Sequence, residues 1–338
     1  MMERAAIRMR TCLAGISLIA SLIAAGCGPK HEPRVRIGIG GQAQLVYLPT
    51  TLAERLGHFR DHGIEVELID FQGGAKALEA LFGGSVDVVS GFYDHTVQMA
   101  AAGKPLVAFV SMMRYPGLAL IASPDASRKI TTVKDLSGAN VGVSAPGSST
   151  HLLFNHLLIG AGLKPESASA IGVGMAAGSV AAMENGKVDA AVMSEPAISQ
   201  LERRKGKLTV LADTRTAEGV RAVYGVDSYP AAVLYSKKEW VEGNEAKTQG
   251  LARALKHTLD WIGAHTAEEI AAKMPAAFAG GDVALYSRAI EQARPMYSQD
   301  GVIAEESAKA VVRVMTETMI KQPVAWDCCF TAKYLGVK

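Results

Sequence analysis

The sequence predicts an α/β protein made of two similarly built lobes. Apolar strand-like runs alternate with helical segments along most of the chain, from VRIGIG at 35–40 to VDAAVM at 188–193. A β-α-β order of this kind predicts mostly parallel sheets with helices on both faces. The segments at 78–89 and 181–192 place a helix, a glycine and a Val-Asp-apolar strand in the same register. With 338 residues, the chain is long enough for two modest domains.

The expected elements follow in order. In the first half we expect strands at 35–40, 64–70, 86–91, 105–112 and 118–123, and helices from Pro49, at 74–84 and at 94–103. In the second half we expect strands at 139–144, 168–174, 188–193 and 231–236, and helices at 150–162 and 178–186. Pro49 suits a first helical position, and Gly84 and Gly186 suit left-handed helix ends. Beyond residue 236 the pattern is helical, with one apolar stripe at Leu251, Leu255, Leu259 and Ile262 and another at Val311, Val312, Met315 and Met319.

The N-terminus has the pattern of an export signal. Three arginines precede an uncharged run at 11–26, which is too short to span a membrane and ends at Cys27. We expect residues 1–26 to be a lipoprotein signal peptide, Cys27 to carry the lipid, and residues 27–34 to form a tether. Residues 24–27 resemble the lipobox, the short motif before the lipid-modified cysteine of bacterial lipoproteins. Ala24 stands where that motif usually has leucine, so secretion without lipid attachment is the alternative. We expect the protein in the periplasm or at the cell surface, anchored to the membrane by its lipid.

Charge and cysteine content exclude several classes of partner. The leader holds three Arg and one Glu, so the net charge of +2 becomes 2 − 2 = 0 for the rest of the chain. A neutral chain without basic clusters is a poor nucleic-acid binder. Cys328 and Cys329 are adjacent; they can close a ring, stay reduced or pair with another chain, and they offer too few ligands for a metal site.

Three sequence patterns resemble those of enzymes, but each lacks a feature that the corresponding site requires. Gly38, Gly40 and Ala43 match a dinucleotide-binding fingerprint, but Pro49 places the helix start several residues too late. His58 and His62 are four residues apart without a zincin glutamate, so we interpret them as a surface turn. No G-x-S-x-G elbow is present. We therefore expect no catalytic residue, cofactor or metal.

A cluster of small hydroxyl residues opens the helix expected at 150–162. Ser148, Ser149 and Thr150 follow a strand and stand at the helix start, after Pro146 and Gly147. Such hydroxyls commonly cap a helix. The same helix end also attracts anions, through its free N–H groups and its dipole. We expect the cluster both to cap the helix and to receive an acidic or strongly polar ligand group.

Longer segments carry a family resemblance. The segments at 135–163 and 178–196 resemble the second lobe of solute-binding proteins of ABC importers, in the branch for sulfonates, taurine, nitrate and thiamine-pyrimidine precursors. The segment at 48–91 is similar to the first lobe of the same proteins. The resemblance implies the two-lobe type II periplasmic-binding fold, each lobe a mostly parallel sheet flanked by helices. Lobe I would comprise 35–121 and 230–338, and lobe II 122–229, with crossings near 121–124 and between 213 and 229 and with the C-terminal helices returning to lobe I.

In this fold, ligands bind where loops follow the carboxyl ends of the strands. Family resemblance and this rule point to the same loops, and the predicted ligand-binding residues are Gln42, Gln44, Gln72, Gly73, Tyr93, Asp94, Ser148, Ser149, Thr150 and Glu195. The glutamines offer amide contacts, Tyr93 a ring or hydroxyl, and Asp94 or Glu195 a carboxylate for an amine. Each also has a purely structural explanation, as a solvated loop residue or a helix cap.

The resemblance implies a monomeric solute-binding component that works with an ABC permease. Its solute would be a small polar or anionic compound: a sulfonate, nitrate, a carboxylate or a pyrimidine-like molecule. One alternative is a thiamine-pyrimidine-synthase-like enzyme on the same fold, whose Cys-rich motif is faintly similar to DCCF at 327–330. Another is a sensory lipoprotein that presents its ligand to a membrane receptor.

Overall fold

The computed structural model describes residues 34–336, so the predicted leader, Cys27 and most of the tether lie outside the described residues. None of the helices described is both long and apolar enough to cross a membrane. The strands are β1 (Val35–Ile39), β2 (Val66–Asp70), β3 (Val88–Phe92), β4 (Leu106–Ser111), β5 (Leu118–Ala122), β6 (Asn140–Val143), β7 (Ser169–Gly172), β8 (Ala190–Ser194), β9 (Thr209–Asp213) and β10 (Ala232–Lys237).

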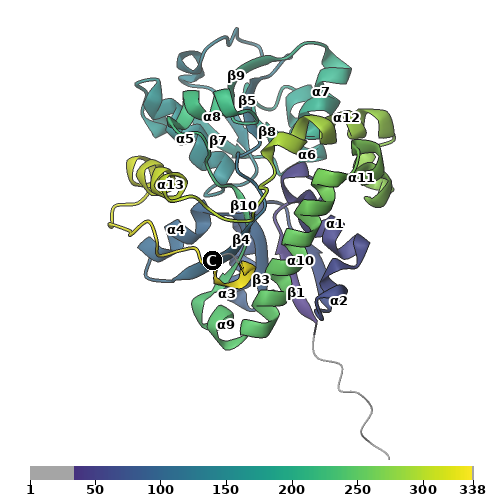
Figure 1. The fold of residues 1–338 in the computed structure, drawn as a ribbon. Coiled ribbons are helices and arrows are strands. Elements are labelled where there is room, and N and C mark those ends of the chain that lie inside the picture. The colour runs from purple at the N-terminus through teal and green to yellow at the C-terminus, as the bar shows by residue number, and fades with distance from the viewer. Residues whose placement is uncertain (1–33, 337–338) are drawn as a thin grey trace, which may run out of the picture. The chain divides into compact units, whose positions relative to one another are not determined.

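The helices lie between these strands in the first two thirds of the chain and dominate its end (Figure 1). They are α1 (Leu48–Leu56), α2 (His58–Asp61), α3 (Gly74–Gly83), α4 (Asp94–Ala101), α5 (Ser149–Gly160), α6 (Ala177–Glu184), α7 (Ala197–Lys205), α8 (Ala217–Tyr224), α9 (Lys238–Gly243), α10 (Glu245–Ala264), α11 (Ala267–Lys273), α12 (Val283–Ala293) and α13 (Glu305–Thr318).

Two five-stranded sheets form the centres of two lobes. The order in lobe I is β2-β1-β3-β10-β4, and the order in lobe II is β7-β6-β8-β5-β9. Each sheet has one strand, β10 or β5, that runs antiparallel to both of its neighbours. The prediction of an α/β fold with two mostly parallel, helix-flanked sheets is confirmed.

The first crossing between the lobes comes earlier in the chain than predicted. Strand β5 pairs with β8 and β9, so residues 118–122 belong to the second sheet and the chain crosses at 112–117. The reason is that β5 is apolar throughout, as is β4 before it, so hydrophobicity alone does not show which sheet each strand joins. The chain returns to lobe I between α8 and β10.

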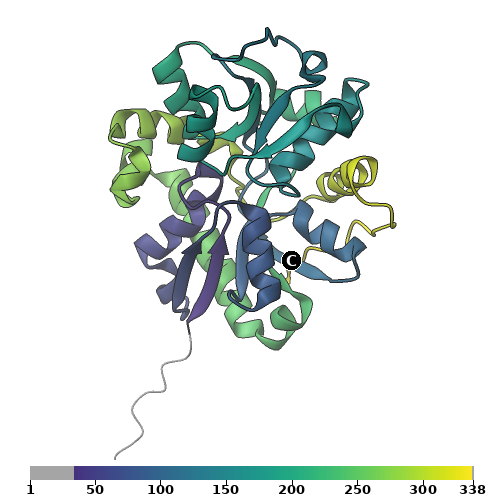
Figure 2. The ribbon, with the colours of Figure 1, turned by 180° about the vertical axis from the view of Figure 1, so that it is seen from behind.

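The C-terminal helices do not all return to lobe I. The apolar stripe of α10 packs on lobe I, with Leu251 and Leu255 fully buried. Helix α12 approaches α7 of lobe II, where Arg203 pairs with Asp282 at 3.3 Å. Helix α13 contacts α4 of one lobe and α5 of the other, and Figures 1 and 2 show it on the opposite side of the molecule from α11 and α12. These helices therefore bridge the two lobes.

Gly40 allows two segments at the edge of the first sheet to meet. A Cβ at this position would lie 2.7 Å from both the Cα and the backbone N of Gly74, at the start of α3. Only a short 3₁₀ helix at Leu45–Tyr47 precedes the α-helix that begins at Leu48, so Gly40 has a packing role and the dinucleotide fingerprint lacks its helix. This close approach brings the loop after β1 beside the first turn of α3.

Candidate functional site

The starts of α4 and α5 face each other across the two lobes. Ser149, the first residue of α5, donates its hydroxyl hydrogen to Oδ1 of Asp94, the first residue of α4, at 2.8 Å. Asp94 is 5% exposed. Its carboxylate thus lies at the positive dipole end of its own helix and close to that of a second helix. Asp94 is therefore a buried acidic group at the contact between the lobes.

The environment of Asp94 opposes its charge on balance. Burial raises the pKa of the Asp94 carboxyl, and the neighbouring His95 together with the hydrogen bond from Ser149 offsets part of that rise. His95 is equally buried, with its Nε2 4.0 Å from Oδ1 of Asp94 and its Nδ1 3.2 Å from the Tyr235 hydroxyl. Burial lowers the pKa of His95, which keeps the ring neutral. Its Nε2 is buried without a hydrogen-bond partner among residues 34–336.

Four buried tyrosines lie close enough to Asp94 for its charge to affect their pKa values. Burial raises the pKa of Tyr47, Tyr224, Tyr229 and Tyr235, and the nearby charge of Asp94 adds to each rise. The rings of Tyr224 and Tyr229 stack with their centroids 3.8 Å apart. The Tyr229 hydroxyl is buried and has no partner in the described part of the chain. The region therefore combines flat apolar surface with polar atoms that still have bonding capacity.

The predicted hydroxyl cluster lies at the start of α5 but does not cap it as expected. Ser148 is the N-cap residue, yet its side chain accepts no hydrogen bond from the first turn. Instead its hydroxyl contacts those of Ser144, at 2.8 Å, and Thr150, at 2.7 Å, and donates to the Ala145 carbonyl at 2.7 Å. The prediction of a side-chain cap is wrong because neighbouring hydroxyls and a carbonyl compete for the Ser148 side chain.

Gln44 and Glu195 hold the lobes together through protein contacts. Gln44 Nε2 donates to the Gly40 carbonyl at 2.8 Å, and its Oε1 accepts from the Ser194 hydroxyl of lobe II at 2.8 Å. Glu195 is 2% exposed and accepts from Arg215 Nη1 at 2.7 Å and from the Ser199 hydroxyl at 2.8 Å. Its carbonyl accepts from the Leu45 amide of lobe I at 3.0 Å. The Glu195 carboxylate is thus already paired, and it also accepts from the backbone N–H of Ser199 at 3.1 Å, in the first turn of α7, as its explanation as a helix cap expects.

Two further predicted residues, Gln72 and Gly73, line the same contact from lobe I, whereas Gln42 forms its hydrogen bond within lobe I. Gly73 has φ +133°, which favours glycine, and a Cβ there would lie 3.3 Å from the Ser144 side chain of lobe II. The Gln72 amide oxygen lies 3.3 Å from where a Cβ of Gly174 would stand. The backbone N–H of Gln42 donates to Asp70 Oδ1 at 2.7 Å.

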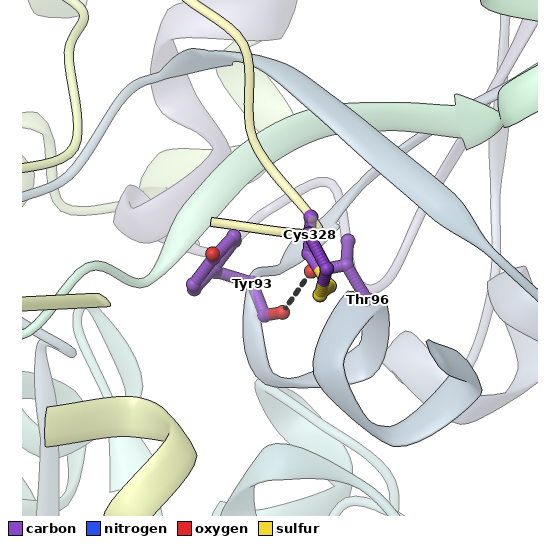
Figure 3. The surroundings of a disulfide bond; sticks show 4 residues. Tyr93, Thr96 and Cys328 are labelled. Atoms are coloured by element: carbon purple, nitrogen blue, oxygen red, sulfur yellow. Dashed lines mark hydrogen bonds between the residues drawn. A yellow bond between two sulfur atoms is a disulfide. The ribbon is translucent and has the colours of Figure 1, made fainter. Parts of the chain in front are cut away.

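Tyr93 is fully buried beside the C-terminal segment. Cys328 and Cys329 form a disulfide with each other, and Figure 3 shows Cys328 next to Tyr93 and Thr96. Thr96 donates its hydroxyl hydrogen to the Tyr93 carbonyl at 2.7 Å, while the Tyr93 hydroxyl is buried without a partner among the described residues. The strand-like segment after the cysteines pairs with β4 at Ala108. Cys328 and Cys329 could close a ring with each other, stay reduced or pair with another chain, and in the structure they close the ring.

A small cavity of about 20 Å³ remains between the lobes beside Ser149, the residue that bonds to Asp94. It is lined by Gly40, Gln44, Tyr47, Gly74, Phe92, Leu118, Ser144, Ser148, Ser149, Thr150 and Met175. Sequence reasoning missed Tyr47 and Met175, since nothing in their local pattern separates them from core residues. Beside Met175, Ala176 has φ +48°, a conformation that costs energy for a residue with a side chain. Strain of this kind is typical of binding loops.

A larger hollow of about 600 Å³ lies on lobe II alone. It is lined by residues of α5, α8, β9 and the segment near Val133, among them Leu157, Gly160, Asp213 and Val223. The Asp213 carboxylate in its wall is already paired with Arg215 at 2.7 Å. We place the functional site at the interlobe cavity because residues of both lobes line it and because Ser149 in its wall donates a hydrogen bond to the buried Asp94 carboxyl.

Comparison with known proteins identifies the family to which this chain belongs. Residues 44–269 match the model of NMT1/THI5-like proteins. The chain belongs to the NMT1/THI5-like family. A solved structure from Bordetella bronchiseptica RB50 is 36% identical over 90% of this chain and 96% of that chain, with a TM-score of 0.86. The alkanesulfonate-binding protein SsuA from Xanthomonas axonopodis, bound to MOPS, shares the fold at 20% identity, covering 85% and 92% of the two chains with a TM-score of 0.67. The family resemblance read from the sequence and the two-lobe periplasmic-binding fold are therefore confirmed.

Curated NMT1/THI5-like relatives are more distant. The 4-amino-5-hydroxymethyl-2-methylpyrimidine phosphate synthase of Schizosaccharomyces pombe is 27% identical over 151 residues, or 45% of this chain and 42% of that protein. The matched regions span between 42% and 65% of the length of the curated relatives. The curated relatives thus include proteins named as synthases, while a protein named as alkanesulfonate-binding shares the fold.

Proposed function

We propose that this protein is the extracytoplasmic solute-binding component of an ABC importer and holds a small polar solute between its lobes. The single observation that carries the proposal is Asp94, an acidic side chain buried where the starts of α4 and α5 meet. Burying a carboxyl group is costly unless it is paired, and sites of function are where such costs are found. A solute that bonds to Asp94 on lobe I and to α5 on lobe II links the two lobes.

Asp94 also favours one of the solute classes that the sequence left open. A carboxylate accepts hydrogen bonds, so it fits a solute with an amino or other N–H donor. The first turn of α5 lacks a side-chain cap from Ser148 and offers N–H groups to an acceptor on the same solute. A pyrimidine-like ring with an amino group carries both functions, and its flat face suits the nearby tyrosines. A sulfonate, nitrate or carboxylate would instead place a negative charge beside a carboxyl group whose ionised form burial already disfavours, whereas a solute with N–H donors would compensate for that burial.

Solute entry requires the lobes to separate. The cavity of about 20 Å³ holds roughly one water molecule, which is far less than an organic ring needs. The contacts to be broken beside the cavity include three hydrogen bonds: Ser149 to Asp94, Ser194 to Gln44, and the Leu45 amide to the Glu195 carbonyl. We infer that the lobes open at the crossings and close again on the solute.

A thermal-shift screen tests this function. Refolded protein, freed of any solute carried through purification, is heated with amines, aminopyrimidines, sulfonates and carboxylates. A solute at 100 times its Kd adds ~2.7 kcal/mol of stability, and we expect amino-bearing heterocycles to raise the Tm by several degrees while sulfonates leave it unchanged. If a sulfonate or nitrate alone raises the Tm, the assignment of the solute class is wrong. If no class raises it, the binding function is wrong.

The synthase relatives provide the second candidate, because they are enzymes by name. Product analysis separates the two. A binding protein returns the solute chemically unchanged, whereas turnover of a pyrimidine precursor would favour the enzyme. A neighbouring permease gene would favour transport over sensing.

The predicted anchor at Cys27 has its own test. Cys27→Ala removes the sulfur that would carry the lipid, so the variant should stay unprocessed or become a soluble exported protein, while the wild type fractionates with membranes. Membrane fractionation with mass measurement of the mature N-terminus checks this. Normal processing and membrane partition of the variant would show that the protein is not a lipoprotein.

A further inference from the structure

Three potential metal ligands meet on lobe I, where α2 packs against α10. His58 and Asp61 come from α2, and His257 comes from α10. One ligand atom from each lies within 4.8 Å of those of the other two. The interpretation of His58 as part of a surface turn is wrong, since His58 is 5% exposed, whereas Asp61 and His257 are exposed. Sequence reasoning missed the group because His257 is distant in the chain.

Hydrogen bonding determines which nitrogen of His58 is available. Thr258 donates its hydroxyl hydrogen to the Ala254 carbonyl at 2.8 Å, so its oxygen acts as an acceptor toward the His58 Nδ1, 2.9 Å away. Nδ1 of His58 therefore carries the proton, and Nε2 carries the lone pair. This arrangement, in which a second hydrogen bond orients a neutral imidazole, is typical of histidines that bind metal ions.

We propose that His58 Nε2, the His257 ring and the Asp61 carboxylate bind one divalent cation of the Zn²⁺ class. Two imidazoles and one carboxylate suit this borderline ion, which often takes three protein ligands and one water. The two rings stack at 3.9 Å with 15° between their planes, so both cannot point at one ion in this arrangement. The exposed His257 ring turns to bring its nitrogen to the ion, and the exposed Asp61 side chain follows.

His62 is left out of the ligand set. Its ring centroid lies 6.0 Å from that of His257, and the rings are nearly perpendicular. A bound ion would join α2 to α10, which pack against each other in lobe I. It would thus stabilise lobe I without taking part in the interlobe site, so this proposal does not depend on the proposed function.

Calorimetric titration with Zn²⁺, on full-length processed chain without a histidine tag, tests the site. We expect one ion per chain, and a Tm that rises with Zn²⁺ and returns to its starting value with a chelator. His257→Ala and Asp61→Asn, both at exposed positions, should each weaken Zn²⁺ binding by at least about tenfold. Asp260→Asn is the matched control, since Asp260 is exposed on the same helix and pairs with Lys256 at 2.6 Å; it should bind Zn²⁺ like the wild type.

Two outcomes would overturn the site. One is a wild-type chain that gives neither heat of binding nor a shift in Tm with Zn²⁺. The other is equal Zn²⁺ affinity in the wild type, His257→Ala and Asp61→Asn, which would place the ion elsewhere on the chain. A single cooperative thermal transition of His257→Ala near the wild-type Tm, measured without Zn²⁺, would show that the variant remains folded.

Discussion

Asp94→Asn is expected to weaken solute binding by about ten- to a hundredfold and, at the same time, to raise the Tm of the solute-free protein. A hydrogen bond to a charged group contributes roughly 1.5–3 kcal/mol, and asparagine keeps the shape of the side chain but not its charge. The gain in stability arises because the carboxyl group is buried with incomplete compensation. Asparagine can still accept the hydrogen bond from Ser149, so the lobe contact is retained.

The sign of the pH dependence follows from the pKa shift. Burial raises the pKa of Asp94 in the folded state, so the folded protein binds this proton more tightly than the unfolded chain. The stability that this group contributes is fully present below its unfolded pKa of about 3.9 and is lost as pH rises through the folded value. Asp94→Asn should therefore exceed the wild type in Tm at pH 7.5 and match it near pH 4. Equal Tm values at both pH values, or unchanged affinity for the solute found in the screen, would contradict this role of Asp94.

Arg215→Ala should cause the largest loss of stability among the charge changes considered. Glu195 is 2% exposed, and its partner Arg215 also pairs with Asp213 at 2.7 Å. Removing the arginine leaves a buried carboxylate without its cation, which costs about 3 kcal/mol or more. At 2–4 °C for each kcal/mol, the Tm should fall by roughly 6–12 °C.

Arg204→Ala is the matched control in the same lobe. Arg204 pairs with Glu184 at 3.0 Å, but its side chain is 56% exposed. An exposed pair contributes less than about 1 kcal/mol, so the Tm should change by only a few degrees. Thermal unfolding of both variants compares them directly. If Arg215→Ala unfolds at the same temperature as Arg204→Ala, Glu195 does not depend on its arginine, and a ligand-binding role for its carboxylate regains support.

Most of the fold could be predicted from the sequence because strand and helix periodicities alternate clearly. Pro49 does stand in the first turn of α1, and Gly84 does end α3 in the left-handed conformation. The assignment of β5 to a lobe could not be predicted, since it depends on pairing with β8 and β9, far along the chain. Local patterns show what a segment forms but not which sheet it joins.

The candidate site could be located from the sequence but not described. The loops after the strands were predicted, and Asp94, Ser149 and Gln44 do lie where the lobes meet. The partners of each side chain were hidden, because they come from distant segments. From the sequence, Glu195 could hold an amine, but in the structure it pairs with Arg215. Ser148 could cap its helix, but in the structure its hydroxyl forms hydrogen bonds with Ser144 and Thr150. The role of a polar group depends on which side chains form hydrogen bonds or ion pairs with it. The fold, not the local sequence, determines which side chains those are.

Native mass spectrometry of the chain purified without refolding tests the central claim most directly, with Asp94→Asn prepared in parallel. The account predicts that the wild type carries one non-covalent small-molecule adduct per chain, that its mass fits a compound with an N–H donor, and that Asp94→Asn lacks it. The same adduct at equal occupancy in both proteins, or a bare chain in both, would contradict the claim that Asp94 holds a solute between the lobes.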